Sequence, residues 1–174
     1  MNGRARTIVA AGIAGGAAAN LAMFLTFRLL GMGLQGGGIL LDPTVQSEKL
    51  IAVWTQLEPL PRVVTQPILM GLGILAFGVL HAYIYQGISA SWPKGIVPRA
   101  MRFGGIIFAM VYLFWEFFTP FNMFGEPVLL TLLELSFWAV VAFAEAFALV
   151  AVMERRARSG MVRPTTHGRD ARAT

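Results

Sequence analysis

Apolar residues are gathered in four long blocks, with polar residues and prolines between them. The blocks cover residues 7–30, 67–86, 100–119 and 127–153. At about 1.5 Å per residue, the last and longest block makes a helix of roughly 40 Å, enough to cross the roughly 30 Å apolar core of a bilayer with some tilt. The pattern therefore predicts an all-α fold, a bundle of four transmembrane helices.

The connection 31–66 is the one long stretch between the blocks. Asp42-Pro43 is typical of a helix start, because aspartate caps free backbone N–H groups and proline fits the first helical position. Apolar residues then recur at i, i+3, i+4 and i+7: Leu50, Val53, Trp54 and Leu57. This periodicity predicts one extracytoplasmic amphipathic helix that lies on the membrane surface or caps the bundle.

Composition agrees with a membrane protein. Hydrophobic residues make up 56% of the chain and charged residues 13%, against roughly half and a quarter in an average soluble domain. The chain divides into a membrane domain, 1–153, and a basic tail, 154–174, that is predicted to be disordered.

Residues 17–19 are alanines and resemble a signal-peptide cleavage site, but the apolar run continues to Leu30, which favours a retained first span.

The basic residues are distributed unevenly between the two sides of the predicted bundle. If the N-terminus is cytoplasmic, eleven Lys and Arg residues lie on the cytoplasmic side and only two, Lys49 and Arg62, on the other. This bias follows the positive-inside rule and predicts that both termini are cytoplasmic. The net charge of +5 is thus a topology signal. No nucleic-acid partner is predicted, because no binding fold or aromatic interleaving accompanies the charge.

Small residues indicate where the helices pack closely. Gly12, Gly16 and Asn20 recur every four residues and form a small-xxx-small ridge on the first span. The glycines that are candidates for packing on the next two spans are Gly71, Gly78 and Gly105. Such residues let helix backbones approach each other in lipid. We therefore expect the bilayer, and also a homo-oligomer or a larger membrane complex, as partners.

Ionisable residues inside the predicted spans fall into two groups by depth. Each is costly in a bilayer unless it is paired or neutral. The outer group is Arg28, Glu116 and Glu134. A tight turn makes the third and fourth spans antiparallel neighbours, so we expect Glu116 to approach Glu134. Two readings stay open: a structural network that Arg28 compensates, or an outward-facing proton or cation site. Arg28 could instead extend to the interface.

The inner group is His81 and Glu145. A contact between them requires the second and fourth spans to be adjacent, and would be a core hydrogen bond, a proton-relay pair, or part of a haem or metal site. Glu134 and Glu145 are eleven residues apart and lie within about 20° on the helical wheel. Their different depths nevertheless predict two separate polar contacts rather than one continuous path.

Residue types exclude several kinds of chemistry. The chain has no cysteine, so disulfides, thiolate metal sites and cysteine nucleophiles are ruled out. The Glu-x-x-His pair of a di-iron bundle is absent, and a single histidine gives at most one haem ligand. No serine belongs to a recognisable triad, and no phosphate-binding glycine loop is present. We therefore predict no catalytic residue, no metal and no cofactor.

Three stretches carry a resemblance to known proteins: WEFFTPFNMFGEP (115–127), LLELSFWAVVAFAEA (132–146) and LLDPTVQSEKLIAVWTQLEPLP (40–61). They resemble families of small bacterial four-span integral membrane proteins. The resemblance covers most of residues 7–153 and implies a location in the bacterial cytoplasmic (inner) membrane. These families have no assigned activity, so the resemblance implies no functional residue.

Three function hypotheses follow from the sequence. The first is a non-enzymatic accessory or scaffold component of a membrane assembly, based on the packing faces and on the missing catalytic constellation. The second is a small proton-coupled carrier or channel that acts as an oligomer, because four spans are few for a transport pathway. The third is a membrane enzyme or redox protein that acts on a lipid or quinone.

Overall fold

The structure, a computed structural model, describes residues 3–161 of the 174-residue chain. Four helices are long and apolar enough to cross a membrane: Gly3–Gly31, Pro67–Ser91, Ile96–Met123 and Val128–Arg156. The predicted fold class, an all-α protein with four such helices, is confirmed. Of the predicted tail, residues 154–161 continue the last helix, and residues 162–174 lie outside the described residues.

Three of the four spans contain turns that are not regular α-helix. The first is α1 (Gly3–Met23) followed by wide π-type turns, η1 (Phe24–Gly31). The second is α4 (Pro67–Ile88), which ends in the 3₁₀ turn η3 (Ser89–Ser91). The third combines α5 (Ile96–Ile107), η4 (Phe108–Leu113), α6 (Phe114–Glu116) and η5 (Phe117–Met123), where η4 and η5 are π-type. The fourth is α7 (Val128–Met161).

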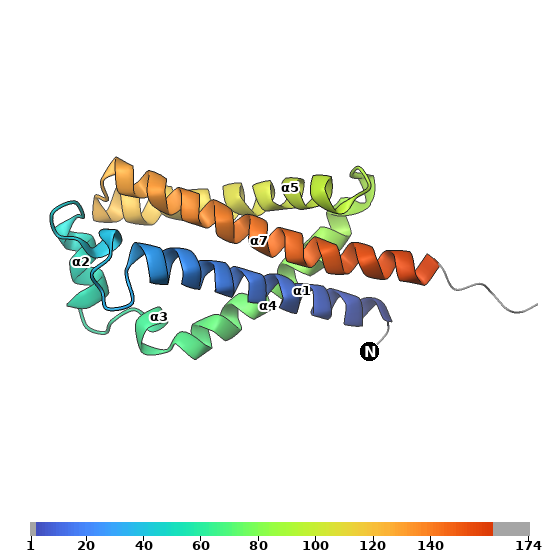
Figure 1. Ribbon diagram of the computed structural model, residues 1–174, viewed down its shortest axis with the longest axis horizontal. Helices are drawn as coiled ribbons and strands as arrows, with labels where there is room; N and C mark the ends of the chain where they lie inside the picture. The colour runs from blue at the N-terminus through green and yellow to red at the C-terminus, as the bar shows by residue number, and fades with distance from the viewer. Residues whose placement is uncertain (1–2, 162–174) are drawn as a thin grey trace, which may run out of the picture.

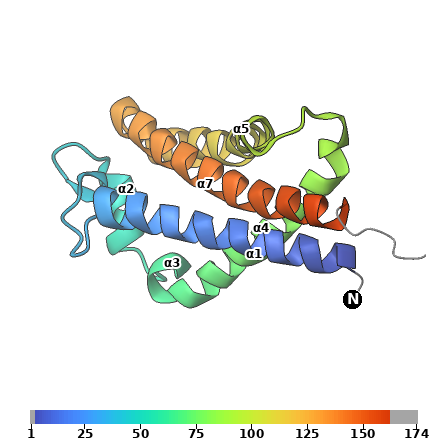
Figure 2. The ribbon, with the colours of Figure 1, turned by 45° about the vertical axis from the view of Figure 1, so that its right-hand side comes forward.

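The helices pack as a row in the order α4, α1, α7, α5 (Figures 1 and 2). The first turns of α1 and the last turns of α7 lie at one end of this row, which we call the inner end (Figure 1). The connection between the first two spans lies at the opposite end, which we call the outer end. At the inner end α4 also meets α5, where the Phe103 ring lies 5.3 Å from Tyr85 and 6.4 Å from Trp92 between centroids.

Small residues determine how closely α1 and α4 cross. A Cβ atom on Gly12 would overlap the backbone of Val79, and one on Gly16 would lie 2.8 Å from the Leu75 Cα atom. Gly78 faces the same crossing and meets the backbone of α1. Nearer the outer end, the Asn20 amide donates a hydrogen bond to the Gly71 carbonyl oxygen, at 3.2 Å. The predicted ridge of α1 thus lies in the crossing, where close packing stabilises helices in lipid.

On α5 the packing glycine is Gly104 rather than Gly105. A Cβ atom on Gly104 would run into the Phe143 ring of α7, whereas one on Gly105 would meet no atom within 4 Å. The prediction for Gly105 is therefore wrong.

The wide turns of η4 then shift the inward face of the third span by one residue, because a π-type turn contains an extra residue. As a result Glu116 is fully buried, while the neighbouring Trp115 is 52% exposed.

The outer connection contains η2 (Ile39–Leu41), α2 (Glu48–Thr55) and α3 (Arg62–Thr65). The amphipathic helix begins at Glu48, later than the Asp42-Pro43 pair predicted, because the Ser47 hydroxyl accepts the hydrogen bond from the Leu50 N–H. Asp42 instead closes a turn. Its carboxylate accepts hydrogen bonds from the Thr44 hydroxyl and N–H, which hold the pKa of Asp42 below its ordinary value. We call residues 39–55 the outer cap.

Candidate functional site

Three carboxylates meet at the outer end of the bundle. Glu116 is in the third span, Glu126 is in the turn that follows it, and Glu134 is in the second turn of α7. One oxygen from each carboxylate lies within 4.8 Å of the others. Glu116 and Glu126 are buried, at 0% and 3% exposure. We call these three residues the carboxylate cluster. Three negative charges this close repel one another strongly, so the cluster must retain protons or hold a cation.

Uncharged donors hold part of the carboxylate cluster. The Trp138 indole N–H donates to Glu116 Oε2 at 3.0 Å. Glu126 accepts two hydrogen bonds, from the Gln46 amide at 2.8 Å and from the Thr131 hydroxyl at 3.2 Å. Trp138 is itself fixed by the Tyr112 ring, which stacks on it with a centroid distance of 4.4 Å. These donors orient the carboxylates without neutralising their charge.

The outer cap binds the turn that carries Glu126. The Ser47 hydroxyl donates to the Phe124 carbonyl oxygen at 2.8 Å, and the Lys49 ammonium donates to the Met123 carbonyl oxygen at 2.5 Å. Lys49 also lies 5.7 Å from the centre of the Phe124 ring, a cation–π distance. Together with the hydrogen bond from Gln46, these contacts cover the cluster from the outer side and bury Glu126. The burial of Glu126 could not be predicted from its position in a polar turn.

Arg28 does not belong to this cluster, and the prediction that it does is wrong. Its guanidinium donates to the carbonyl oxygens of Gly33 and Leu34, at 3.3 and 2.8 Å, and its side chain is exposed. The residue lies in η1, close to the outer end, where a long side chain reaches the polar surface more easily than the interior of the bundle. The two glutamates of the prediction do meet, but with Glu126 as the third member.

The structure also brings His81 and Glu145 together. His81 Nδ1 lies 2.7 Å from Glu145 Oε1, and the two side chains are 13% and 4% exposed. Because α1 lies between α4 and α7, Glu145 has to reach past α1. Gly15 allows this, since a Cβ atom there would lie only 3.3 Å from the Glu145 Cγ atom. A small residue on the middle helix therefore makes this contact possible.

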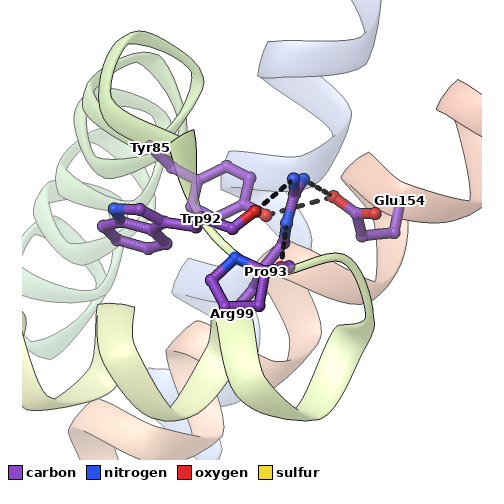
Figure 3. Close-up of polar contacts among 5 residues, drawn as sticks. All are labelled: Tyr85, Trp92, Pro93, Arg99 and Glu154. Atoms are coloured by element: carbon purple, nitrogen blue, oxygen red, sulfur yellow. Dashed lines mark hydrogen bonds and ion pairs between the residues drawn. The ribbon is translucent and has the colours of Figure 1, made fainter. Parts of the chain in front are cut away.

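A third polar centre lies at the inner end, and sequence reasoning missed it. The Arg99 guanidinium donates to Glu154 Oε1 at 2.5 Å, and the Tyr85 hydroxyl donates to the same oxygen at 3.2 Å (Figure 3). Arg99 also donates to the carbonyl oxygens of Trp92 and Pro93. A signal was present, because Arg99 opens the third span and Glu154 follows the fourth apolar block. Charged residues commonly flank membrane spans, so their positions alone do not predict the contact.

A small apolar layer lies at the depth of Val141, between Glu134 and Glu145 on α7. Its buried members are Ala19, Ala22 and Val141, and the Tyr112 and Trp138 rings are among the partly buried side chains that pack against them. The two glutamates on one face of α7 therefore belong to different polar contacts, Glu134 above this layer and Glu145 below it.

The architecture defines a class, that of multi-pass α-helical membrane proteins. No protein-family model, curated protein or solved structure matches the chain. Its function is therefore inferred from its own residues.

Proposed function

We propose that this protein is a non-enzymatic accessory or scaffold component of a membrane assembly. The observation that carries the proposal is that the two glutamates of α7 make different contacts. Glu134 lies among the other carboxylates and Glu145 contacts His81, with the buried Val141 between them on the helix. A proton or ion path through one copy needs polar groups or water at successive depths. The inner polar groups are instead engaged in contacts between helices: His81 with Glu145, and Arg99 and Tyr85 with Glu154.

We further propose that the protein resides in a bacterial cytoplasmic membrane with both termini on the cytoplasmic side. The support is the charge bias of the sequence, with eleven basic residues on the proposed cytoplasmic side and two on the other. In this orientation the carboxylate cluster and the outer cap face the extracytoplasmic side.

A small carrier or channel is the second candidate, and the carboxylate cluster favours it, because buried acidic residues in membrane proteins often mark ion or proton pathways. In this case the pathway would have to run between copies of the chain, because four spans are few for a transport pathway. The carrier hypothesis therefore requires a homo-oligomer, whereas the accessory hypothesis requires a different protein.

The test is the mass and composition of the particle that contains the full chain. The protein is cross-linked in its native membrane, purified in two mild detergents, and analysed by light scattering and mass spectrometry. The accessory role predicts a second protein at the same molar ratio in both detergents. A homo-oligomer that drives proton-coupled uptake in proteoliposomes would contradict it, provided that Glu134→Gln abolishes the uptake. A Soret band in the purified protein would also contradict it, because it would reveal a redox cofactor.

A further inference from the structure

We propose that the carboxylate cluster is a binding site for a hard divalent cation of the Ca²⁺ type. Glu116, Glu126 and Glu134 would supply the ligand oxygens. The site is a property of this chain alone and does not depend on the accessory role proposed above.

The first observation is the charge at the outer end. Three acidic side chains converge there, and two basic side chains of the outer end bind backbone carbonyls instead. Arg28 donates to the carbonyl oxygens of Gly33 and Leu34, and Lys49 donates to that of Met123. A bound divalent cation would cancel two of the three negative charges, and it would do so in the buried space where charge is most costly.

The second observation is an unsatisfied oxygen. Glu116 is fully buried, and its Oε1 atom has no hydrogen-bond partner among the described residues. Its other oxygen, Oε2, accepts the Trp138 N–H, and that bond orients the carboxylate. Buried polar atoms are nearly always paired, and each one left alone in a native protein needs an explanation. A cation bound among the three carboxylates would be the missing partner of Oε1.

The third observation is the size of the cluster. Ca²⁺ binds oxygen at about 2.3 to 2.6 Å, so two oxygens that share one ion lie at most about 5 Å apart. The ligand oxygens of the cluster lie within 4.8 Å of one another, which satisfies this limit. Small movements of the side chains would bring all three into contact with a common ion.

The donor set selects the class of metal. It consists of carboxylate oxygens, and hard cations such as Ca²⁺, Mg²⁺ and Mn²⁺ prefer oxygen, whereas Zn²⁺ and Cu²⁺ favour imidazole and thiolate. The chain has no cysteine, and His81 is paired with Glu145 on the other side of the apolar layer. Ca²⁺ fits better than Mg²⁺, because it tolerates irregular coordination while Mg²⁺ demands a near-ideal octahedron.

Binding would connect three parts of the molecule. The ligands come from the third span, from the turn and from α7, and Gln46 of the outer cap donates to Glu126. An ion held by all three carboxylates would therefore fix the turn and the outer cap on the bundle. We expect the folded protein to become more stable when the ion binds, because ligands that bind the native state stabilise it.

The experiment uses the full chain in detergent, stripped with EDTA and then titrated with Ca²⁺ while its thermal unfolding is followed. At an excess of about 100-fold over Kd, Ca²⁺ should raise Tm by roughly 5 to 10 °C. Mn²⁺ serves as a spectroscopic probe, and its electron paramagnetic resonance signal should show one bound ion per chain that Ca²⁺ displaces. K⁺ at the same ionic strength should leave Tm unchanged.

Two variants locate the site, and a third variant is the matched control. Glu116→Gln and the less buried Glu134→Gln should each lose the Ca²⁺ shift and at least tenfold of the Mn²⁺ affinity. Glu145→Gln changes another buried carboxylate of α7 and should keep both responses. Wild-type protein that binds neither ion would overturn the proposal, as would binding that both cluster variants retain. A cluster that holds protons alone would leave Tm unchanged by Ca²⁺, which also overturns it.

Discussion

The carboxylates at the two ends of the bundle have opposite surroundings. In the inner half, Glu145 faces His81, and Glu154 faces Arg99, so each acidic group meets a basic group on another helix. At the outer end, in the described part of the chain, the acidic groups meet one another and uncharged hydrogen-bond donors only. The residue type and the burial are similar, yet the inner contacts join helices while the outer cluster repels itself unless something else binds. The partner of a buried carboxylate, rather than its burial, therefore indicates what it does.

The uneven distribution of basic residues explains this difference. The inner end carries most of the Lys and Arg residues, and one of them, Arg99, opens the third span where it can reach Glu154 (Figure 3). The outer end has few basic residues, and there Arg28 and Lys49 bind backbone carbonyls. Charge segregation that orients a membrane protein thus leaves the carboxylate cluster without a basic partner among residues 3–161.

The largest effect is expected from a substitution that separates His81 from Glu145 and leaves the carboxylate cluster intact. Gly12→Val places a branched side chain where the backbone of Val79 lies, so α4 must move away from α1. This movement also pulls His81 away from Glu145. Overpacking typically costs about 1 to 3 kcal/mol, occasionally more, and the lost contact adds to that. We expect the free energy of unfolding to fall by about 3 kcal/mol in a denaturant titration.

Gly73→Val is the matched control for this prediction. Gly73 is on α4 as well, but a Cβ atom there would meet no atom within 4 Å, so the variant should stay within about 0.5 kcal/mol of the wild type. The Ca²⁺ response of Gly12→Val should persist, because α4 supplies no residue to the carboxylate cluster. Equal losses in the two valine variants would show that the crossing is not as close as described.

The second prediction is that the same Glu→Gln substitution changes the stability differently in the two halves of the bundle. Glu145→Gln weakens a charge-assisted contact with His81 and should lower the stability by about 1 kcal/mol. Glu134→Gln removes one of three repelling charges and, in EDTA, should leave the stability unchanged or raise it by up to about 1 kcal/mol. Thermal unfolding of both variants in EDTA compares them directly. A loss of stability in both variants would mean that the outer cluster is held together as firmly as the inner pair.

Hydrophobic pattern and residue size were sufficient to predict much of this molecule. Four apolar blocks gave the four spans, and the small-residue ridge at Gly12 and Gly16 lies in the crossing with α4. The proximity of Glu116 and Glu134 followed from the tight turn between their helices. These features depend on neighbours in the chain or on a regular helical period, and a single sequence contains both.

The features that escaped prediction depend on long-range contacts or on departures from the regular period. Glu126 looks like a solvent-exposed turn residue until Gln46, 80 positions earlier, covers it. The wide turns of η4 shift the inward face by one residue, which a constant 100° per residue cannot anticipate. Arg28 has about the right depth for the cluster, but its side chain turns to the loop carbonyls. Depth along a helix does not determine the direction of a long side chain.

The smallest expected effect concerns Arg28 and tests the contrast between the basic residues of the two ends. Arg28→Gln removes two hydrogen bonds to exposed loop carbonyls, which water can replace, so the stability should change by less than about 0.5 kcal/mol. Arg99→Gln should cost more, about 1 to 2 kcal/mol, because Glu154 would lose its charged partner in a half-buried site. If Arg28 did compensate the carboxylate cluster, Arg28→Gln would destabilise the protein as much as Arg99→Gln and would strengthen Ca²⁺ binding. Unfolding curves of both variants, each with and without Ca²⁺, separate these two arrangements.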